Sequence, residues 1–294
     1  MPELPDVELY RERLLALLAG CALQALDIAN PFLLRSVTPS PAELEGRVLR
    51  EVRRIGKRLA LGFEGDRWAV LHLMIAGRLK WRATGRRAPA GRAQARFRFP
   101  NGTLHFTEAG SQRRASVHLV QGEASLARFD RGGLEPLTAS TAAFAERLRS
   151  ERHTLKRSLT DPTLFSGIGN AYSDEILHRA RLSPLQLSTN LDDAEIARLH
   201  EAVRAELAEW LERLRGEVGD GFPEEVTAFR PGMAVHGRYR EPCPACGTPI
   251  QRIRYAENET NYCARCQTGG RLLADRAMSR LLKDDWPRSI DDVE

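Results

Sequence analysis

Towards its C-terminal end the chain reads Cys243-Pro-Ala-Cys246 and, sixteen residues later, Cys263-Ala-Arg-Cys266. This spacing is typical of a zinc hairpin, in which each pair of thiolates supplies half of one tetrahedral site. Four free or disulfide-paired cysteines are the alternative, which is disfavoured because the first residues are acidic and do not resemble a secretory signal. A closed four-cysteine site is structural. We therefore expect one Zn²⁺ per chain, which stabilises a hairpin and takes no part in catalysis.

The length and composition indicate a globular protein of more than one domain. The 294 residues are about twice the usual domain size, so we expect two domains and a small third module. Hydrophobic residues make up 42% and charged residues 28% of the chain, which excludes collagen-like and wholly disordered classes. The longest apolar stretch, residues 68–77, is too short to span a bilayer. We expect no membrane partner and a cytoplasmic protein, associated with the nucleoid in a prokaryote.

The basic residues are clustered. The net charge is only +5, but residues 50–58 hold five cations and residues 78–98 hold eight cations and no acid. From residue 272 onward there are four basic and six acidic side chains, so the rest of the chain carries a net charge of +7. A basic body with an acidic end favours a polyanionic partner, although solvated charge in an arginine-rich protein stays an alternative. Arginine outnumbers lysine 40 to 4, so Lys57 and Lys156 stand out.

The apolar pattern changes along the chain from strand-like to helical. It predicts a helix over 5–19. Short apolar runs interrupted by glycine and proline follow, as is typical of strands; examples are 69–74, 97–99 and 104–106. The run 126–129 is the last of this region. Three helices follow over 142–150, 155–160 and 171–181. A long amphipathic helix begins at Asp192 and ends at Gly216. The acidic, glycine-containing residues 216–225 are either a linker or a mobile lid.

Two further stretches carry a resemblance to a known family. The chain opens Met1-Pro-Glu-Leu-Pro-Asp-Val-Glu8, and the segment at the 171–181 helix reads Gly167-Ile-Gly-Asn170-Ala-Tyr172-Ser-Asp-Glu175. Together with the four-cysteine module, and in this order, they resemble the formamidopyrimidine-DNA glycosylase/endonuclease VIII family over residues 1–267.

The resemblance implies an α+β, two-lobed protein. Its parts are an N-terminal β-sandwich catalytic domain with flanking helices over 1–132, a helix-two-turn-helix domain over 138–230, a zinc finger hairpin over 231–271 and an extension over 272–294. The resemblance also implies that damaged double-stranded DNA is the partner and lies between the lobes. We expect a monomer. Residues 272–283 predict an amphipathic helix, which either packs back on the body or binds a partner of unknown identity.

The resemblance also implies catalytic roles near the amino end. Pro2, exposed by removal of Met1, matches the nucleophile that attacks C1′ of the damaged nucleotide and forms a Schiff base. Glu3 matches the acid that shuttles protons. Lys57 falls on a lysine that binds phosphate beside the lesion, and His72 on a histidine that contacts the DNA backbone. Without the surrounding match, Pro2 would be interpreted only as a stiff first residue. Glu3 would then be interpreted as a favourable charge at a helix N-terminus.

Three more DNA-binding residues follow from the resemblance in the second half of the chain. Lys156 matches a lysine near the lesion, Asn170 a phosphate-binding asparagine, and His236 the position of a tyrosine. A glycine turn before a helix N-terminus is physically a phosphate site, although Asn170 is also suited to cap that helix. We expect Glu175 to support the fold.

Some positions depart from the family pattern. Where the family inserts Met, Arg and Phe into the gap left by an extruded base, this chain has Ile75, Arg113 and Ala115, so only Arg113 is retained. In the zinc hairpin, Asn258 stands where the family has a phosphate-binding arginine. Three other basic side chains of the hairpin could compensate: Arg252, Arg254 and Arg265.

We therefore interpret the chain as a bifunctional DNA glycosylase/abasic-site lyase from an atypical branch, acting in base excision repair of oxidised or otherwise damaged bases. The alternative is a lesion- or structure-specific DNA-binding protein of the same fold with weak or no base excision. Pro2, Glu3 and Lys57 favour the enzyme, whereas Ala115 and Asn258 favour the alternative. A zinc-ribbon transcription protein would account for the cysteines but leaves the amino-end match unexplained.

Overall fold

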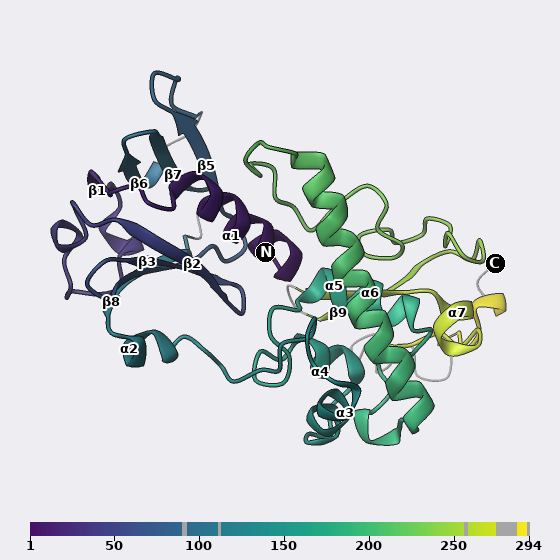
Figure 1. Ribbon diagram of the computed structural model, residues 1–294. Helices are drawn as coiled ribbons and strands as arrows, with labels where there is room; N and C mark the ends of the chain where they lie inside the picture. Colours follow the sequence, from purple (N-terminus) through teal and green to yellow (C-terminus); the bar gives the residue numbers. More distant parts are fainter. Residues whose placement is uncertain (90–92, 111–112, 256–257, 275–286, 293–294) are drawn as a thin grey trace. The chain divides into compact units, whose positions relative to one another are not determined.

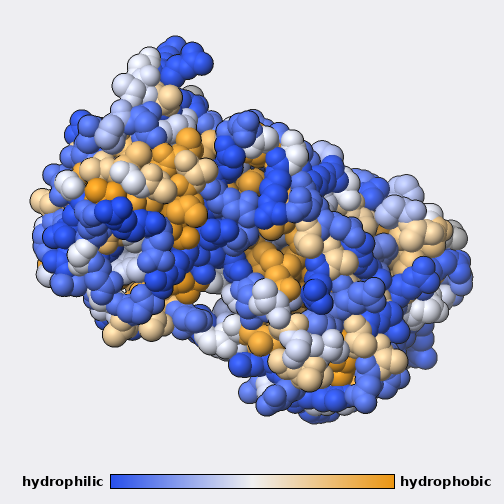
Figure 2. Space-filling model, in the orientation of Figure 1, coloured by the Kyte–Doolittle hydropathy of each residue, from blue (hydrophilic) through white to orange (hydrophobic). Residues whose placement is uncertain are grey.

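The computed structural model describes residues 1–89, 93–110, 113–255, 258–274 and 287–292, and the chain forms two compact units (Figure 1). Unit 1 comprises Met1–Arg131 and Trp210–Ala228, and unit 2 comprises Gly132–Glu209 and Phe229–Glu294. Their helices and sheets confirm the predicted α+β class. In the view of Figure 2 most of the surface is hydrophilic, and hydrophobic residues form separate patches. No helix in the described ranges is long and apolar enough to cross a membrane.

Helix α1 (Leu4–Leu18) begins unit 1 and matches the prediction closely. Glu3 is its N-cap residue and a proline stands in its first turn, which suits a helix start. Val7, Tyr10 and Leu14 recur at helical spacing and are all fully buried. They place one face of α1 in the main core of the unit.

Two four-stranded antiparallel sheets form the rest of that core, ordered β2-β3-β4-β8 and β1-β6-β7-β5. Inward-facing side chains of both sheets belong to one hydrophobic cluster, which confirms the predicted β-sandwich. The strands are β1 (Ala25–Ile28), β2 (Leu49–Ile55), β3 (Arg58–Phe63), β4 (Arg67–His72), β5 (Gly77–Ala83), β6 (Ala93–Phe99), β7 (Gly102–Glu108) and β8 (Ser116–Gln121). Short 3-10 helices η1 (Pro31–Leu33) and η2 (Pro41–Glu43) follow β1.

The apolar run that closes this region is not a strand. Leu126 lies in the short helix α2 (Glu123–Ala127), where it packs with Trp68 and Val70 on the outer face of the β2-β3-β4-β8 sheet. A four-residue apolar run is compatible with both a strand and a helical turn. Here the helical turn places Leu126 in the hydrophobic cluster with Trp68 and Val70.

The helices of unit 2 lie close to their predicted positions. They are α3 (Thr141–Arg149), α4 (Leu155–Thr160), α5 (Asn170–Arg179) and α6 (Asp193–Val218), with η3 (Ser188–Asn190) before α6. The predicted stop of α6 at Gly216 is wrong, because the helix continues to Val218. Gly219 has φ +54° and donates its N–H to the carbonyl of Arg215 at 2.8 Å, which ends the helix. A glycine inside a helix costs only about 1 kcal/mol, which the packing of α6 overrides.

The loop after α6 packs on unit 1. The Phe222 ring lies 5.6 Å from the Tyr10 ring, and Glu224 forms an ion pair with Arg82 of β5. Arg13 of α1 donates to the carbonyl of Gly221 at 2.7 Å. In the structure this segment, predicted as a linker or a mobile lid, is a loop docked on α1 and β5.

The zinc hairpin consists of β9 (Gln251–Tyr255), β10 (Asn258–Tyr262) and α7 (Ala264–Thr268). Residues 287–292, which include η5 (Ile290–Asp292), pack against it. The Ile290 N–H donates to the carbonyl of Gly270 at 2.8 Å, and the Ile290 side chain is 1% exposed in a cluster with Ile253 and Tyr262. This is the behaviour expected of an extension that packs back. Most of the helix predicted over 272–283 lies outside the described residues.

Candidate functional site

The amino end of the chain is buried at the start of α1. Pro2 and Glu3 are both buried, and the backbone N–H of Glu3 donates to the Asp6 carboxylate at 2.9 Å. Burial lowers the pKa of the Met1 amino group; Glu3 opposes this effect, and Arg78 and Lys57 reinforce it. Since only a neutral amine is a nucleophile, this environment favours a reactive amine at neutral pH.

Lys57 lies at the tip of the β2–β3 hairpin. Ile55 pairs with Arg58, which leaves Gly56 and Lys57 as a two-residue turn. Gly56 has φ +59°, the positive value that such a tight turn needs at its first central position. Because Lys57 contributes to the electrostatic field at the amino group, the structure brings it together with Pro2 and Glu3.

Charged side chains fasten α1 to this hairpin. Arg54 Nε donates to Glu8 Oε2 at 2.9 Å, and Arg54 Nη1 donates to the carbonyl of Gly56 at 3.3 Å. The Arg54 side chain is only 9% exposed. The pair therefore ties the turn that carries Lys57 to the helix that follows Glu3. The sequence offers no spacing that would reveal this pair, because its members are 46 residues apart.

Arg58, His72 and Ser116 form a row across β3, β4 and β8, next to the Lys57 turn. The partly buried guanidinium of Arg58 donates to the carbonyl of Phe129 at 3.4 Å and, within the described residues, has no carboxylate partner. A shielded cation without an acid is unfavourable in the isolated protein. An anion supplied from outside would relieve it.

His72 is neutral in this surrounding. Burial lowers its pKa to about 4, and the cations Arg58 and Lys57 add to the shift. At pH 7 its imidazole therefore offers a hydrogen bond and no charge. The structure places His72 beside Lys57 and Arg58, and its contact with DNA stays a prediction.

The three positions expected at the gap of an extruded base differ in exposure. Ile75, in the turn after β4, is 59% exposed, and Arg113 is also exposed. Ala115 is only 2% exposed and belongs to the core, while its backbone N–H donates to Glu108 at 2.9 Å. A side chain at position 115 therefore faces inward, and only Ile75 and Arg113 are available to fill a gap.

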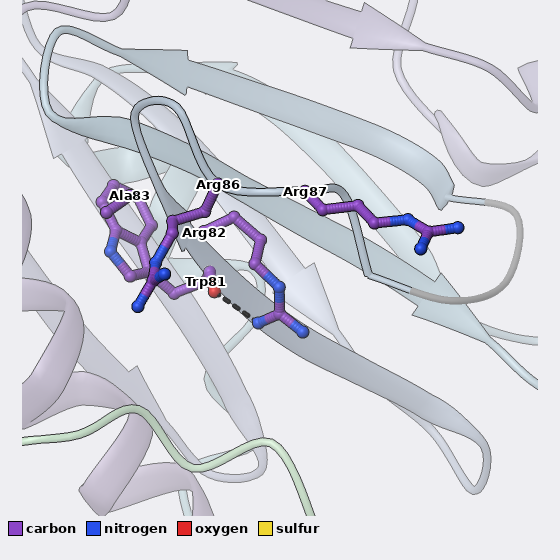
Figure 3. A pocket seen from close by; sticks show the side chains of 5 residues that line it. All are labelled: Trp81, Arg82, Ala83, Arg86 and Arg87. Carbon is purple, nitrogen blue, oxygen red and sulfur yellow. Dashed lines mark hydrogen bonds between the residues drawn. The ribbon is translucent and has the colours of Figure 1, made fainter.

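The second basic stretch forms a pocket at the end of β5 and the start of the connection to β6. Trp81, Arg82, Arg86 and Arg87 are among the residues that line about 400 Å³ of open space (Figure 3). Arg82 donates to the carbonyl of Trp81 at 2.6 Å, and Arg87 points away from the other side chains. None of the candidate catalytic residues lines this pocket, so it is separate from the site at the amino end.

In unit 2 the candidates converge on Asp174, which is 1% exposed. Its carboxylate accepts from Lys156 Nζ at 2.5 Å, lies 2.8 Å from His236 Nδ1 and accepts from Asn261 Nδ2 at 3.3 Å. Lys156 Nζ also donates to the carbonyl of Asn170 at 2.6 Å. Both Lys156 and His236 are buried, so these polar groups bind one another inside the protein. Their contacts with DNA stay predictions, and neither Asp174 nor Asn261 was expected from the sequence.

Glu175, the next residue of α5, has the structural role that we expected from the sequence. The Glu175 carboxylate accepts from the backbone N–H groups of Ala234, Val235 and His236, the last at 2.8 Å. Burial raises the pKa of Glu175, and these three hydrogen bonds oppose the shift. At the start of α5, the N-cap residue is Gly169 and Asn170 is the first helical residue, so the alternative role of Asn170 as the cap is wrong.

The four cysteines form one cluster suited to zinc. Their Sγ atoms all lie within 4.8 Å of one another, with Cys243 and Cys266 at 3.9 Å and Cys246 and Cys263 at 3.4 Å. Sulfurs around a tetrahedral Zn²⁺ with bonds of about 2.3 Å would be about 3.8 Å apart. His178 Nε2 of α5 lies 3.3 Å from Cys243 Sγ, where it can donate to the thiolate, as groups around zinc sites do. The set fits one structural zinc.

The structure discriminates among the basic side chains that could replace the missing hairpin arginine. Arg252 Nη1 lies 3.4 Å from Glu259 Oε2, and Arg265 forms an ion pair with Asp291. Arg254, on β9, is exposed and makes no ion pair with the described residues. It is therefore the candidate that stays available.

Comparison with known families accounts for most of the chain. Residues 1–115 match the formamidopyrimidine-DNA glycosylase N-terminal domain, residues 133–219 the formamidopyrimidine-DNA glycosylase H2TH domain, and residues 240–269 the zinc finger found in FPG and IleRS. The three segments follow one another in the order of the β-sandwich, the helices and the four-cysteine hairpin.

Individual relatives match this chain over most of their own length. The chain is 34% identical to the formamidopyrimidine-DNA glycosylase of Pelotomaculum thermopropionicum, covering 91% of this chain and 99% of the relative. It is 42% identical to an uncharacterized formamidopyrimidine-DNA glycosylase-like protein of Mycobacterium tuberculosis, over 51% of this chain and 94% of the relative.

Solved structures show the same fold. The Lactococcus lactis Fpg in complex with DNA containing an abasic site superposes with a TM-score of 0.79 at 25% identity, covering 90% of this chain and 99% of that one. The MutM (Fpg) protein from Thermus thermophilus gives a TM-score of 0.75 at 34% identity, covering 90% and 98%.

Loss of one zinc ligand should release the metal and disorder the hairpin. Cys263→Ser leaves three thiolates, and a structural zinc supplies the folding free energy of such a hairpin. We expect metal analysis to find almost no zinc, and hydrogen exchange to show loss of protection in β9 and β10, while the far-ultraviolet circular dichroism of the helices persists. Cys21→Ser, which removes the one cysteine outside the cluster, is the matched control and should keep its zinc. A Cys263→Ser protein with a full complement of zinc would contradict the assignment.

His72 should make stability depend on pH. Its pKa is about 4 in the folded chain and about 6.5 when unfolded, so the unfolded state binds the proton more readily. The free energy of unfolding should therefore fall as the pH drops from 6.5 to 4. Urea unfolding across this range should show a shallower fall for His72→Gln, whose remaining slope comes from other histidines. Equal slopes for both proteins would show that His72 is not shielded.

Proposed function

Because the chain belongs to the formamidopyrimidine-DNA glycosylase family, we propose that its Pro2, once Met1 is removed, is the nucleophile that acts on damaged double-stranded DNA. The family consists of DNA glycosylases of base excision repair that also cleave the strand at the abasic site, and the chain shares this activity. The buried amino end carries the assignment, because Pro2 and Glu3 are both buried there and removal of Met1 would place the Pro2 amine beside the Glu3 carboxylate.

A terminal amine is better suited to this chemistry than a lysine. The usual pKa is about 8 for an α-amino group and about 10.4 for lysine, so at pH 7 roughly a few hundred times more of the terminal amine is neutral. At this amino end burial lowers the pKa of the Met1 amino group further, and Pro2, the next residue, is itself buried. A proline nitrogen at the chain end is a secondary amine, which can form one bond to carbon and then an iminium.

The reaction then follows from electron flow at the sugar. The Pro2 nitrogen attacks C1′, the bond between C1′ and the base breaks, and the base leaves with that electron pair and takes up a proton. The sugar ring opens and C1′ becomes an iminium. When a proton leaves C2′, the electron pair of that bond flows into the iminium and gives an enamine. The enamine then expels the 3′ phosphate, which leaves with its bonding electron pair, and a second elimination releases the 5′ phosphate. Glu3 is the group that gives and takes these protons.

Other residues hold the DNA. Lys57 and His72 bind the phosphate beside the damaged nucleotide, supported by their position next to Arg58, a cation with no acid among the described residues. Arg113 enters the gap left by the extruded base, supported by its exposure. In unit 2, Asn170 binds phosphate at the start of α5, and Lys156 and His236 support it through their contacts around Asp174.

The proposal includes the setting of this activity. The enzyme acts as a monomer in the cytoplasm, or at the nucleoid of a prokaryote. The basic stretches at residues 50–58 and 78–98 support binding to duplex DNA.

Borohydride should trap the processed wild type on abasic DNA through the N-terminal peptide, since it reduces the iminium to a stable amine. Pro2→Gly should impair both base removal and strand cleavage. Glu3→Gln should impair base removal more than cleavage of a ready-made abasic site, because expulsion of the base needs an added proton. Gel assays on damaged and abasic oligonucleotides, with peptide mass spectrometry of the adduct, measure these effects.

The control is a protein that keeps Met1, which should not be trapped. An adduct on Lys57 or Lys156, or full trapping by the protein that keeps Met1, would overturn the assignment of Pro2. Binding to damaged DNA without any base removal would favour the alternative of a non-catalytic DNA-binding protein.

Lys57→Ala and Arg113→Ala should weaken DNA binding in different ways. Lys57 binds a phosphate, so its loss should weaken binding to damaged and undamaged duplex alike, and should reduce the slope of log K against log salt by about 0.9. Arg113 fills a gap that exists only around an extruded base, so its loss should weaken binding mainly to damaged duplex. Arg114→Ala is the matched control for position 113. Equal effects of Arg113→Ala on both duplexes in titrations would contradict its role.

A further inference from the structure

A groove of about 570 Å³ lies in unit 1 on the edge of the β2-β3-β4-β8 sheet. Residues 35–39 run along the edge strand β8, where the Arg35 N–H donates to the carbonyl of Val117 at 2.9 Å and the Leu119 N–H donates to Ser36 Oγ at 2.7 Å. The opposite wall is formed by residues after α2, including Arg128. These two hydrogen bonds to β8 therefore hold the wall formed by residues 35–39 in place.

The groove concentrates positive charge around His118. Burial lowers the pKa of His118, and Arg58, Arg35 and Arg128 lower it further. None of the described residues that line the groove carries a carboxylate. Within the described residues Arg35 and Arg128 form no ion pair, and Arg128 Nε donates only to the carbonyl of Ser125 at 3.3 Å. Such a cluster attracts an anion, and burial of its floor strengthens the attraction.

The groove continues the row of residues that hold the phosphate beside the lesion. Ser116 of β8 pairs with His72, and His118 lies two residues further along β8 on the same face of the sheet. Two residues of a strand span roughly 7 Å. This separation is close to the distance between neighbouring phosphates of one DNA strand.

We propose that Arg35, His118 and Arg128 form a second phosphate site, which binds a phosphodiester of the duplex away from the damaged nucleotide. The inference rests on the proposed function, because the substrate supplies this phosphodiester. Val37, which lines the groove and is 94% exposed, favours a DNA backbone over a free anion. A deoxyribose would cover this apolar side chain, whereas inorganic phosphate would leave it in water.

The test compares Arg35→Ala/Arg128→Ala with wild type in salt titrations on undamaged duplex and on duplex with an abasic-site analogue. A phosphate contact carries no sequence or lesion information, so affinity should fall about tenfold on both duplexes. The slope of log K against log salt should become less steep by about 0.9, the value for one phosphate. Arg35→Lys/Arg128→Lys keeps the charge and should recover most of the slope.

Arg213→Ala is the matched control, since it removes an exposed guanidinium whose partner is Glu217 on the same helix. It should bind both duplexes as wild type does. Wild-type binding by Arg35→Ala/Arg128→Ala, or a loss confined to the abasic analogue, would overturn the proposal. So would a double variant that loses thermal stabilisation by inorganic phosphate but binds DNA normally, because the site would then take a free anion.

The same samples separate the inference from the function on which it rests. Borohydride trapping of wild type on abasic DNA tests the function without reference to the groove. If trapping fails, the proposed nucleophile is wrong, yet the salt slopes on undamaged duplex still decide whether the groove binds a DNA phosphate.

Discussion

Two consecutive carboxylates on α5 hold the parts of unit 2 together. Asp174 binds Lys156 of α4, His236 and Asn261 of the zinc hairpin, while Glu175 accepts three backbone N–H groups from residues 234–236. A buried carboxylate is stable only with such a full set of partners. The helices and the metal hairpin are thus linked through a single helical turn, and a change at either acid would disturb both.

The charged side chains of unit 1 are arranged differently. Acids are used where they fasten α1 to the β2–β3 hairpin, as Glu8 does with Arg54. On the outer face of the β2-β3-β4-β8 sheet, Arg58 and Arg128 have backbone carbonyls as their described acceptors. The two buried acids of unit 2 are therefore paired within that unit, whereas this face of unit 1 leaves positive charge for an external anion. This difference explains how a protein with a small net charge can favour a polyanionic partner.

Patterns along the chain predicted much of the fold but only the outline of the site. The four-cysteine spacing and the helical periodicity of α4 reflect local geometry, so they appear in the sequence. The links of Asp174 to His236 and of Glu8 to Arg54 join residues 62 and 46 positions apart, and no local pattern records them. Gly216 was misjudged as a helix end because packing outweighs a propensity of about 1 kcal/mol. The burial of Lys156 likewise depends on partners that only the fold reveals.

The inward orientation of Ala115 limits which side chains this position can hold. The alanine occupies a filled part of the sandwich core, and its backbone N–H is committed to Glu108. A phenylalanine introduced here alone would overpack that core, at a cost of about 1–3 kcal/mol, before it could reach any base. Recovery of an aromatic turn would need the segment around residues 108–116 to be rebuilt as a whole. A single Ala115→Phe substitution would therefore destabilise the sandwich without adding an aromatic side chain to its surface.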